Sequence, residues 1–227
     1  MLAIFKREFK SYFQNVIGWL FVAALLAVYG LYFYVYNLKN GYPYISYDLK
    51  GIGFIMMIAV PILTMRSLSD EKKTKTDQLM LTSPVSVGRI VAGKYFAMAA
   101  VYTIVIALFA LSPLVLSIYG KVALSEAYVA LFGYWLYGLS CIAVGLFISS
   151  ISESVIISAI LTFTALFLSY MMQSITGLIS SSGNLLTKVL NCFDLYTPFE
   201  NFVSGCFSVT SAIYYVTVIL LLCFLTT

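Results

Sequence analysis

Long apolar runs separated by short polar stretches dominate the pattern of this chain. A helix crosses the hydrocarbon core of a bilayer with about 20 mostly apolar residues, and five of the six longest uncharged runs exceed that length. The runs are continuously apolar, without the inside–outside alternation of strands in a membrane β-barrel. The sequence therefore predicts an all-α polytopic membrane protein. The six uncharged runs are 11–38, 51–65, 95–120, 127–152, 154–187 and 201–227.

The runs and their flanking residues predict six transmembrane helices in a single transmembrane domain. The second run has only fifteen uncharged residues, so its helix must end close to Asp48 or Lys50 on one side and Arg66 on the other. Pro61 is expected to kink this helix, because proline removes a backbone donor and clashes with the preceding turn. The expected spans are 16–36, 47–68, 95–118, 128–149, 155–173 and 209–227, and the last of these ends with the sequence, which leaves truncation of the C-terminus open.

Residues 1–15 show the pattern of an amphipathic helix lying on a membrane. Aromatic and apolar side chains recur at helical spacing on one face, and basic ones occupy the other. A cleaved signal peptide is disfavoured, because the following apolar run is too long and lacks a small-residue cleavage site. We expect the basic side chains to anchor the helix at the lipid headgroups. The apolar face comprises Phe5, Phe9, Tyr12, Phe13 and Val16, and the polar face comprises Lys6, Arg7, Lys10 and Gln14.

Charged residues are scarce and unevenly placed. They make up 10% of the chain, against roughly 25% in a soluble domain. Residues 66–94, called the polar island below, hold six of the thirteen basic residues and three of the nine acidic ones. Together with residues 1–15 the island carries nine Lys and Arg, against four in the remaining loops, and basic loops stay inside. The N-terminus and the island are therefore expected in the cytoplasm.

Side chains suited to catalysis or metal binding are sparse. The chain has no histidine, so it offers no imidazole base and no histidine metal ligand. No carboxylate lies in the middle of a span, and Asp194 and Glu200 of the outer segment are expected to accept hydrogen bonds from nearby backbone. No catalytic, cofactor-binding or metal-binding residue is predicted. Four cysteines (Cys141, Cys192, Cys206 and Cys223) lack C-x-x-C spacing and favour small apolar packing, with a Cys192–Cys206 disulfide as the alternative.

One stretch of the island nearly matches a phosphate-binding loop. Residues 88–94 read G-x-x-x-x-G-K, but Tyr95 follows where the motif needs the Ser or Thr that binds Mg²⁺. No strand precedes the stretch, and a spanning helix follows it. We interpret it as the entry to the third span, with Arg89 and Lys94 as anchors at the inner headgroups.

The middle of the island predicts a short helix. Thr74 and Asp77 have the spacing of a capping box, so a helix is expected from about Lys75 to Thr82, ending before Pro84. This helix would present three apolar side chains, Leu79, Met80 and Leu81, between two spans. Such a tip suits either the headgroup region or a groove on a soluble protein.

The island resembles the cytoplasmic loop of type-2 ABC transporter permeases. In that family an acidic and basic lead precedes Gly-Thr, a Glu, a leucine run and Pro-Val. Here Lys75 replaces the Gly and Gln78 replaces the Glu. The string FKREFKSYFQNVIGWLF resembles the N-terminus of the gliding-motility-type branch, and YTPFENFVSG resembles the segment before the last span. The matching island positions are Glu71, Thr76, Leu79, Leu81, Pro84, Val85 and Lys94.

The resemblance implies the membrane subunit of an ABC transporter in a bacterial cytoplasmic membrane. Such a subunit forms a homodimer or heterodimer and is not itself an enzyme. It works with a separate ABC ATPase that binds ATP and Mg²⁺, and it has no nucleic-acid partner. Residues 69–94 would form the coupling loop, and residues 174–208 would form short outer re-entrant helices. The implied contacts with the ATPase are Glu71, Thr76, Asp77, Gln78, Leu79, Met80, Leu81 and Pro84.

Two functions are compatible with this pattern. The first is a permease that exports an amphiphilic or apolar cargo, a cargo class favoured because the spans are expected to lack buried charge. The alternative is a non-transporting membrane anchor or assembly protein whose island recruits a soluble partner. The identity of the cargo, the residues along its path and the direction of transport stay open on the sequence alone.

Overall fold

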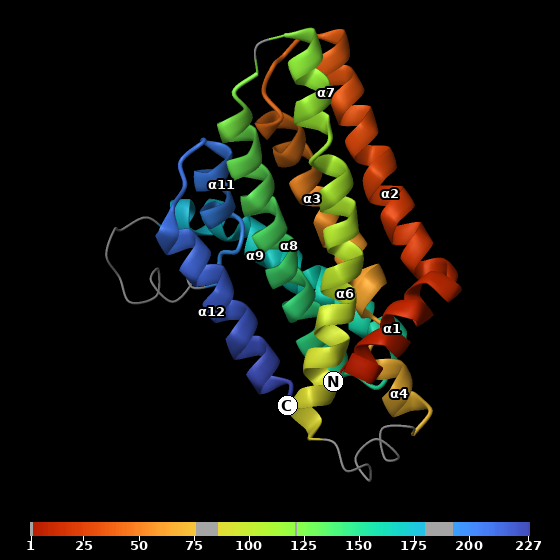
Figure 1. Ribbon diagram of the computed structural model, residues 1–227. Helices are drawn as coiled ribbons and strands as arrows, with labels where there is room; N and C mark the ends of the chain where they lie inside the picture. The colour runs from red at the N-terminus through yellow and green to blue at the C-terminus, as the bar shows by residue number, and fades with distance from the viewer. Residues whose placement is uncertain (1, 76–85, 121, 180–192) are drawn as a thin grey trace.

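The computed structural model describes residues 2–75, 86–120, 122–179 and 193–227, and every regular element within these ranges is a helix (Figure 1). The predicted all-α class is thus confirmed for the described part of the chain. The helices are α1 (Leu2–Gln14), α2 (Val16–Phe33), the π-helix η1 (Tyr34–Lys39), α3 (Ser46–Thr64), α4 (Ser69–Lys73), α6 (Val87–Phe109), α7 (Ser112–Tyr119), α8 (Leu124–Ile151), α9 (Val155–Ile179), α11 (Thr197–Val203) and α12 (Val209–Leu225).

Five helical stretches in the described ranges are long and apolar enough to cross a membrane. Three of them run through two successive elements, namely α2 with η1, α3 with α4, and α6 with α7. The fourth is α8, and the fifth is the first part of α9. Helix α12 is apolar throughout but has 17 residues, so it is shorter than the others. The protein therefore has the architecture of a multi-pass membrane protein. The five stretches are Val16–Lys39, Ser46–Lys73, Val87–Tyr119, Leu124–Ile151 and Val155–Met172.

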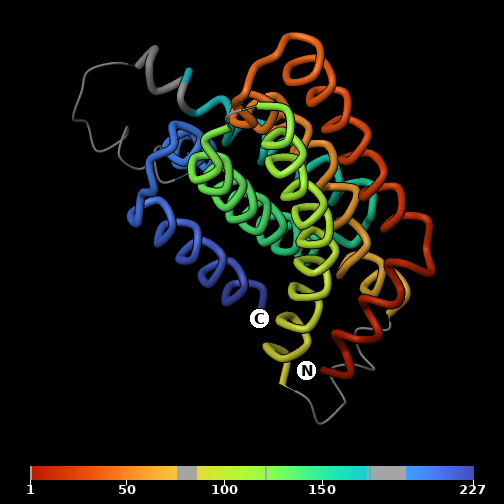
Figure 2. The backbone as a smooth tube through the Cα atoms, turned by 45° about the horizontal axis from the view of Figure 1, so that its top comes forward, coloured from red at the N-terminus to blue at the C-terminus, as the bar shows by residue number. Residues whose placement is uncertain are grey.

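Helix α8 lies at the centre of the bundle. It packs against α3, α6, α9, α11 and α12, and most of its residues are buried. Figures 1 and 2 show the marked N- and C-terminal ends together with α4 at one end of the bundle, whereas α7 lies at the other. The polar island thus begins at the same end as the two marked ends of the chain.

Three glycines of α8 explain how its neighbours come so close. A Cβ atom at any of these positions would overlap a side chain of the facing helix, so the contact requires glycine. Each glycine faces a different neighbour, which makes α8 the common packing partner. Gly133, Gly138 and Gly145 face Phe202 of α11, Tyr102 of α6 and Thr64 of α3, respectively.

The N-terminal helix was predicted and is present as α1. It turns back against α2 at Asn15, and a Cβ at Gly18 would overlap the backbone of Tyr12. The indole nitrogen of Trp19 donates to the carbonyl oxygen of Phe13 at 2.9 Å, which fixes the turn. Helix α1 also packs against α6. Its aromatic face therefore rests partly on the bundle, with Phe9, Tyr12 and Phe13 packed against the core.

The connection between α9 and α12 contains one short helix in its described part, α11. The Asp194 carboxylate accepts hydrogen bonds from the backbone nitrogens of Tyr196 and Thr197 at 3.0 and 2.9 Å. This confirms the expectation for Asp194. Glu200 instead accepts a hydrogen bond from Lys50 of α3 at 3.4 Å. Helix α9 continues to Ile179, past the expected end of its span at 173, and residues 180–192, with Cys192, lie outside the described ranges.

The expectation that the spans hold no buried charged residue is wrong at Asp48, and a second charged residue, Lys94, is buried one position before the expected span 95–118. Asp48 in the first turn of α3 is 0% exposed, and Lys94 in α6 is 2% exposed. Both lie near the ends of their helices, which is why the long uncharged runs did not include them. Each residue is paired with a polar side chain from another part of the chain, as described below.

Candidate functional site

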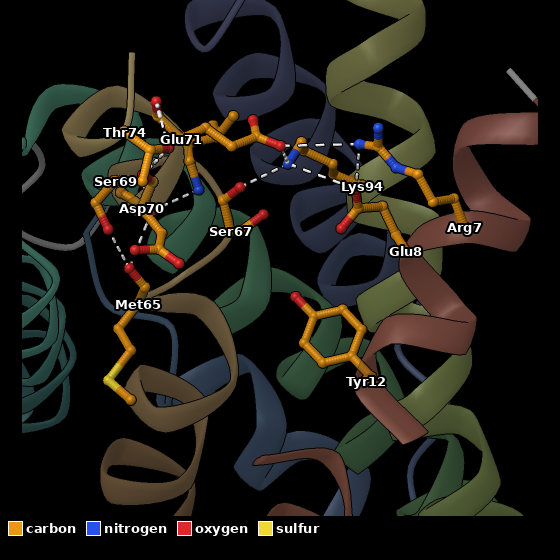
Figure 3. Close-up of polar contacts among 12 residues, drawn as sticks. Arg7, Glu8, Tyr12, Met65, Ser67, Ser69, Asp70, Glu71, Thr74 and Lys94 are labelled. Carbon is orange, nitrogen blue, oxygen red and sulfur yellow. Dashed lines mark hydrogen bonds and ion pairs between the residues drawn. The ribbon is translucent and has the colours of Figure 1, made fainter. Parts of the chain in front are cut away.

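A network of charged side chains surrounds the beginning of the polar island. Four charged side chains meet there: Arg7 and Glu8 of α1, Glu71 of α4 and Lys94 of α6 (Figure 3). We call these four the basal cluster. Two are cationic and two anionic, so the cluster is electrically balanced. It joins three helices that are distant in sequence.

Lys94 is the buried centre of the basal cluster. Its Nζ donates to Glu71 Oε1 at 2.7 Å and to the carbonyl oxygen of Ser67 at 2.6 Å. Glu8 Oε1 lies 3.8 Å from the same Nζ. Removing an ammonium from water costs several kcal/mol in proteins, and this cost is offset only by close partners such as these. Lys94 therefore holds the island's first residues against α6.

Arg7 and Glu8 complete the cluster from α1. Arg7 Nη2 lies 2.7 Å from Glu8 Oε1 and 3.8 Å from Glu71 Oε1. The Arg7 side chain is 57% exposed, so its ion pairs contribute about 1 kcal/mol or less. The strong link in the cluster is therefore the buried pair of Lys94 and Glu71, and α1 is attached around it.

Tyr12 provides a second link between α1 and the bundle. Its hydroxyl donates to the carbonyl oxygen of Leu63, near the end of α3, at 3.5 Å. Burial raises the pKa of Tyr12, and the charge of Glu8 raises it further, so the phenol stays protonated and can donate. Helix α1 thus contacts the last turn of α3 as well as the island.

The central helix α8 is also tied to the island. The hydroxyl oxygen of Ser149 accepts hydrogen bonds from the backbone nitrogens of Leu68 and Ser69, each at 3.1 Å. The ammonium of Lys72 donates to the carbonyl oxygen of the neighbouring Ser150. Ser149 is fully buried and caps the otherwise unpaired amides at the start of α4. A displacement of α4 would consequently act directly on α8.

Helix α4 ends where the sequence predicted a helix to begin. Thr74 was expected as an N-cap, but its hydroxyl donates back to the carbonyl oxygens of Asp70 at 2.8 Å and Glu71 at 3.3 Å. Lys75 has a φ of 55°, which is the left-handed conformation that terminates helices and favours glycine. Lys75 is therefore not the first residue of the predicted helix, and the rest of that helix, residues 76–82, lies outside the described residues. The hydroxyl of Thr74 competes for carbonyls of the preceding turn, and the spacing to Asp77 alone did not reveal this.

The predicted contacts with the ATPase are mostly outside the described residues. Glu71 is described and lies in the basal cluster. The remaining ones, Thr76, Asp77, Gln78, Leu79, Met80, Leu81 and Pro84, fall within the undescribed range 76–85, so their role stays a prediction.

The five expected headgroup anchors divide into two groups. Lys6, Arg7, Lys10 and Arg89 are exposed, as an anchor requires, and their anchoring stays a prediction. Lys94 is different, because its ammonium is buried and bound to Glu71 rather than directed to the headgroups. The near-match to a phosphate loop, residues 88–94, lies inside α6, and its lysine is this same buried Lys94.

Three members of this site were missed on the sequence: Glu8, Ser67 and Ser149. Glu8 carried a usable signal, since it is the first acidic residue of the chain and none follows before Asp48. It stands among three basic residues on a helix assigned to the headgroups. Ser67 contributes its backbone carbonyl, which any residue type could supply. Ser149 contributes a hydroxyl near the end of α8, and a serine at that position does not by itself indicate a contact with the island.

Comparison with known families decides the class of this protein. A family model described as ABC-2 family transporter protein matches residues 33–227, which is most of the chain. The chain belongs to this family. The match includes the helices from η1 onward and the whole island, whereas α1 and nearly all of α2 precede it. No curated protein gives a significant match. Glu71 and Lys94 of the basal cluster therefore lie within the part of the chain that matches the family, whereas Arg7 and Glu8 precede it.

Proposed function

We propose that this ABC-2 permease is the membrane subunit through which a separate ABC ATPase drives transport, with the island as the docking and coupling element. The observation that carries the proposal is the attachment of α4 to the rest of the protein. Glu71 binds Lys94 of α6, and the backbone at Leu68 and Ser69 binds Ser149 of α8. A partner that moves the island therefore moves α4, α6 and α8 together.

The mechanism follows from this connectivity. ATP and Mg²⁺ bind on the partner, and this chain contributes no catalytic residue. Closure of two ATPases shifts the two islands of a permease dimer, which is a homodimer or a heterodimer. Packed helices respond to such a shift by rigid-body movement rather than by local deformation. Helix α1 moves with the island because Arg7 and Glu8 bind the basal cluster, so a movement of the island also displaces α1 in the headgroup region.

The proposal also includes the membrane, the orientation of the chain in it, and the direction of transport. We place the island and α1 in the cytoplasm of a bacterium, the chain in the cytoplasmic membrane, and the protein in the gliding-motility-type branch of the family. The six expected spans make the chain one half of an exporter. The buried Lys94 and Asp48 are engaged within the protein by Glu71 and Asn37. Neither buried group is left free to bind a charged cargo, which favours an amphiphilic or apolar cargo.

Co-purification with a candidate ATPase tests the docking assignment. The permease and an ATPase encoded beside it are expressed together, and the complex is isolated through a tag on the permease. Leu79→Asp combined with Leu81→Asp is expected to abolish association, because two carboxylates cannot enter an apolar groove. The control is Leu38→Asp combined with Tyr42→Asp, which places the same two charges on exposed residues, one near the end of η1 and one in the loop between η1 and α3. A complex that survives the island substitution would contradict the proposal.

Measuring ATP turnover separates the two candidate functions. A permease is expected to change the rate at which the bound ATPase hydrolyses ATP. A membrane anchor that recruits a soluble partner would bind it without such a change, and that result would support the alternative.

A further inference from the structure

A buried amide–carboxyl pair joins the two helices of the first hairpin at the end of the bundle opposite the basal cluster. Asn37 belongs to η1, the π-helical turn that extends α2, and Asp48 lies in the first turn of α3. Asn37 is 5% exposed and Asp48 is 0% exposed. The Nδ2 atom of Asn37 donates a hydrogen bond to Oδ2 of Asp48. Turns of π-helix are often found at functional sites, and this one directs Asn37 inward.

Each partner in this pair keeps one oxygen without a hydrogen bond. Oδ1 of Asn37 and Oδ1 of Asp48 are both buried and both lack a partner among the described residues. An amide oxygen and an ionised carboxylate oxygen are acceptors only, so the two cannot satisfy each other. Leaving two acceptors buried and unpaired is costly, and a native structure rarely does so.

The surroundings of Asp48 supply no counter-charge within the described ranges. Lys50, two residues along α3, is bound to Glu200 of α11, and Lys39 at the end of η1 is exposed. Tyr29 of α2 faces Asp48, but its hydroxyl is bonded to Ser112 of α7. The ionisable groups that approach α3 elsewhere are neutral tyrosines: Tyr32 packs on Gly51, Tyr196 contacts Gly53, and Tyr170 of α9 contacts Phe54. Helix α8 also carries Tyr128, Tyr134, Tyr137 and Cys141, and its one acidic residue, Glu126, lies beside Gly205.

We propose that a proton occupies this pair, so that Asp48 is a neutral carboxylic acid whose Oδ1–H donates to Oδ1 of Asn37. A single proton then satisfies both unpartnered oxygens. The amide and the acid form a ring of two hydrogen bonds, one in each direction, and no charge is left in the buried site. The proton comes from water and returns to it, and no other bond is made or broken.

This arrangement makes the hairpin contact sensitive to protons. With the proton bound, the two hydrogen bonds hold η1 against the start of α3. When the proton leaves, two acceptors face each other around a buried negative charge, and hydration of Asp48 then favours separation of the helices. Protonation and opening of this end of the hairpin are therefore linked, whatever moves the hairpin during transport.

Infrared spectroscopy of the full-length protein in lipid tests the proposal directly. A protonated carboxyl has a C=O stretching band distinct from that of a carboxylate, and the band shifts when the sample is moved to D₂O. At pH 7 the wild type is expected to show this band, and Asp48→Asn is expected to lose it. The control is Glu200→Gln, which removes an ion-paired carboxylate from the same end and should keep the band. A wild-type spectrum without the band at pH 7, or a band that persists in Asp48→Asn, would overturn the proposal.

Thermal stability gives a second, independent measurement. A proton held by the folded protein and released on unfolding makes stability fall as the pH rises, by about tenfold in the unfolding equilibrium per pH unit. Asp48→Asn keeps both hydrogen bonds, because its new amide donates to Oδ1 of Asn37, so this variant should remain folded and lose that part of the pH dependence. Equal pH dependence in the two proteins would contradict the proposal. So would a wild type whose stability at fixed pH depends on Na⁺, because a cation would then occupy the pair.

Discussion

Lys94 of α6 and Glu71 of α4, 23 positions apart in the sequence, form an ion pair with 2.7 Å between Nζ and Oε1. The lysine is 2% exposed and the glutamate side chain is 20% exposed, so the cation is the buried partner. This asymmetry has a consequence for the two single substitutions. Removing the glutamate leaves a buried ammonium, whereas removing the lysine leaves a carboxylate that water and Arg7 still reach.

Glu71→Gln is therefore expected to destabilise the protein more than Lys94→Met does. Breaking a buried pair by removing one partner costs about 3–5 kcal/mol, and we expect Glu71→Gln to approach the lower value. Lys94→Met should cost less, because methionine fills similar volume and the remaining carboxylate is partly hydrated. The double substitution should cost less than the sum of the two. Thermal unfolding in detergent measures all three.

Arg89→Met is the matched control for that series. It removes a basic residue from the same helix, but one that is exposed. Its effect on the unfolding temperature should be small. If Arg89→Met and Lys94→Met shift the unfolding temperature equally, the buried pair is not what holds the island to α6.

Ser149→Ala should loosen α4 from the central helix. The substitution removes the acceptor of two backbone amides, those of Leu68 and Ser69, and an unsatisfied buried donor costs about 1–3 kcal/mol. Hydrogen exchange at these two amides is expected to accelerate by at least fivefold. Ser150→Ala is the control, because Lys72 binds the backbone carbonyl of Ser150 and the substitution leaves that carbonyl in place. Equal effects of the two substitutions would exclude a specific role for the Ser149 hydroxyl.

Helix prediction succeeded where the physical signal is local. Uncharged runs of bilayer length marked five of the helices, since burial in lipid demands both apolar side chains and internal backbone hydrogen bonds. Helix boundaries were less accurate. Helix α9 continues to Ile179, past the expected end of its span at 173, whereas α6 begins at Val87, in agreement with the interpretation of residues 88–94 as the entry to the third span.

The basal cluster was only partly predictable. Its members come from α1, α4 and α6, and no periodicity within one segment indicates that Glu8 and Glu71 both approach Lys94. Lys94 was instead interpreted from its place beside an apolar run, which is where headgroup anchors also occur. The left-handed conformation of Lys75 was not predicted either. A clue was present, because the family pattern that the island resembles has glycine at this position, and a φ of 55° favours glycine.

Lys75→Gly should therefore stabilise the end of α4. A non-glycine residue in the left-handed region costs about 1–2 kcal/mol, and glycine removes most of that cost. The amides of Thr74 and Lys75, which bond to the carbonyls of Asp70 and Lys72, should exchange about fivefold more slowly. Lys75→Ala tests whether loss of the charge alone is responsible, since alanine keeps the strain. Slower exchange in the alanine variant would contradict this explanation.

Gly145→Ala should separate α8 from α3. The added methyl group would overlap the side chain of the buried Thr64, and overpacking of this kind costs about 1–3 kcal/mol. Gly30→Ala is the matched control, because a Cβ there meets nothing within 4 Å. Alanine in the interior of α2 should even add about 0.5–1 kcal/mol of stability. Unfolding temperatures that do not separate the two variants would argue against close packing at Gly145.

The central claim is that the island transmits force through the basal cluster, and ATP turnover by the reconstituted complex tests it most directly. Permease and ATPase are combined in lipid vesicles, and binding and turnover are measured on the same sample for the wild type, Lys94→Met and Arg89→Met. We predict that all three bind the ATPase, that the wild type and Arg89→Met change its turnover equally, and that Lys94→Met abolishes this change while remaining folded. Wild-type turnover in a folded Lys94→Met complex would contradict the account.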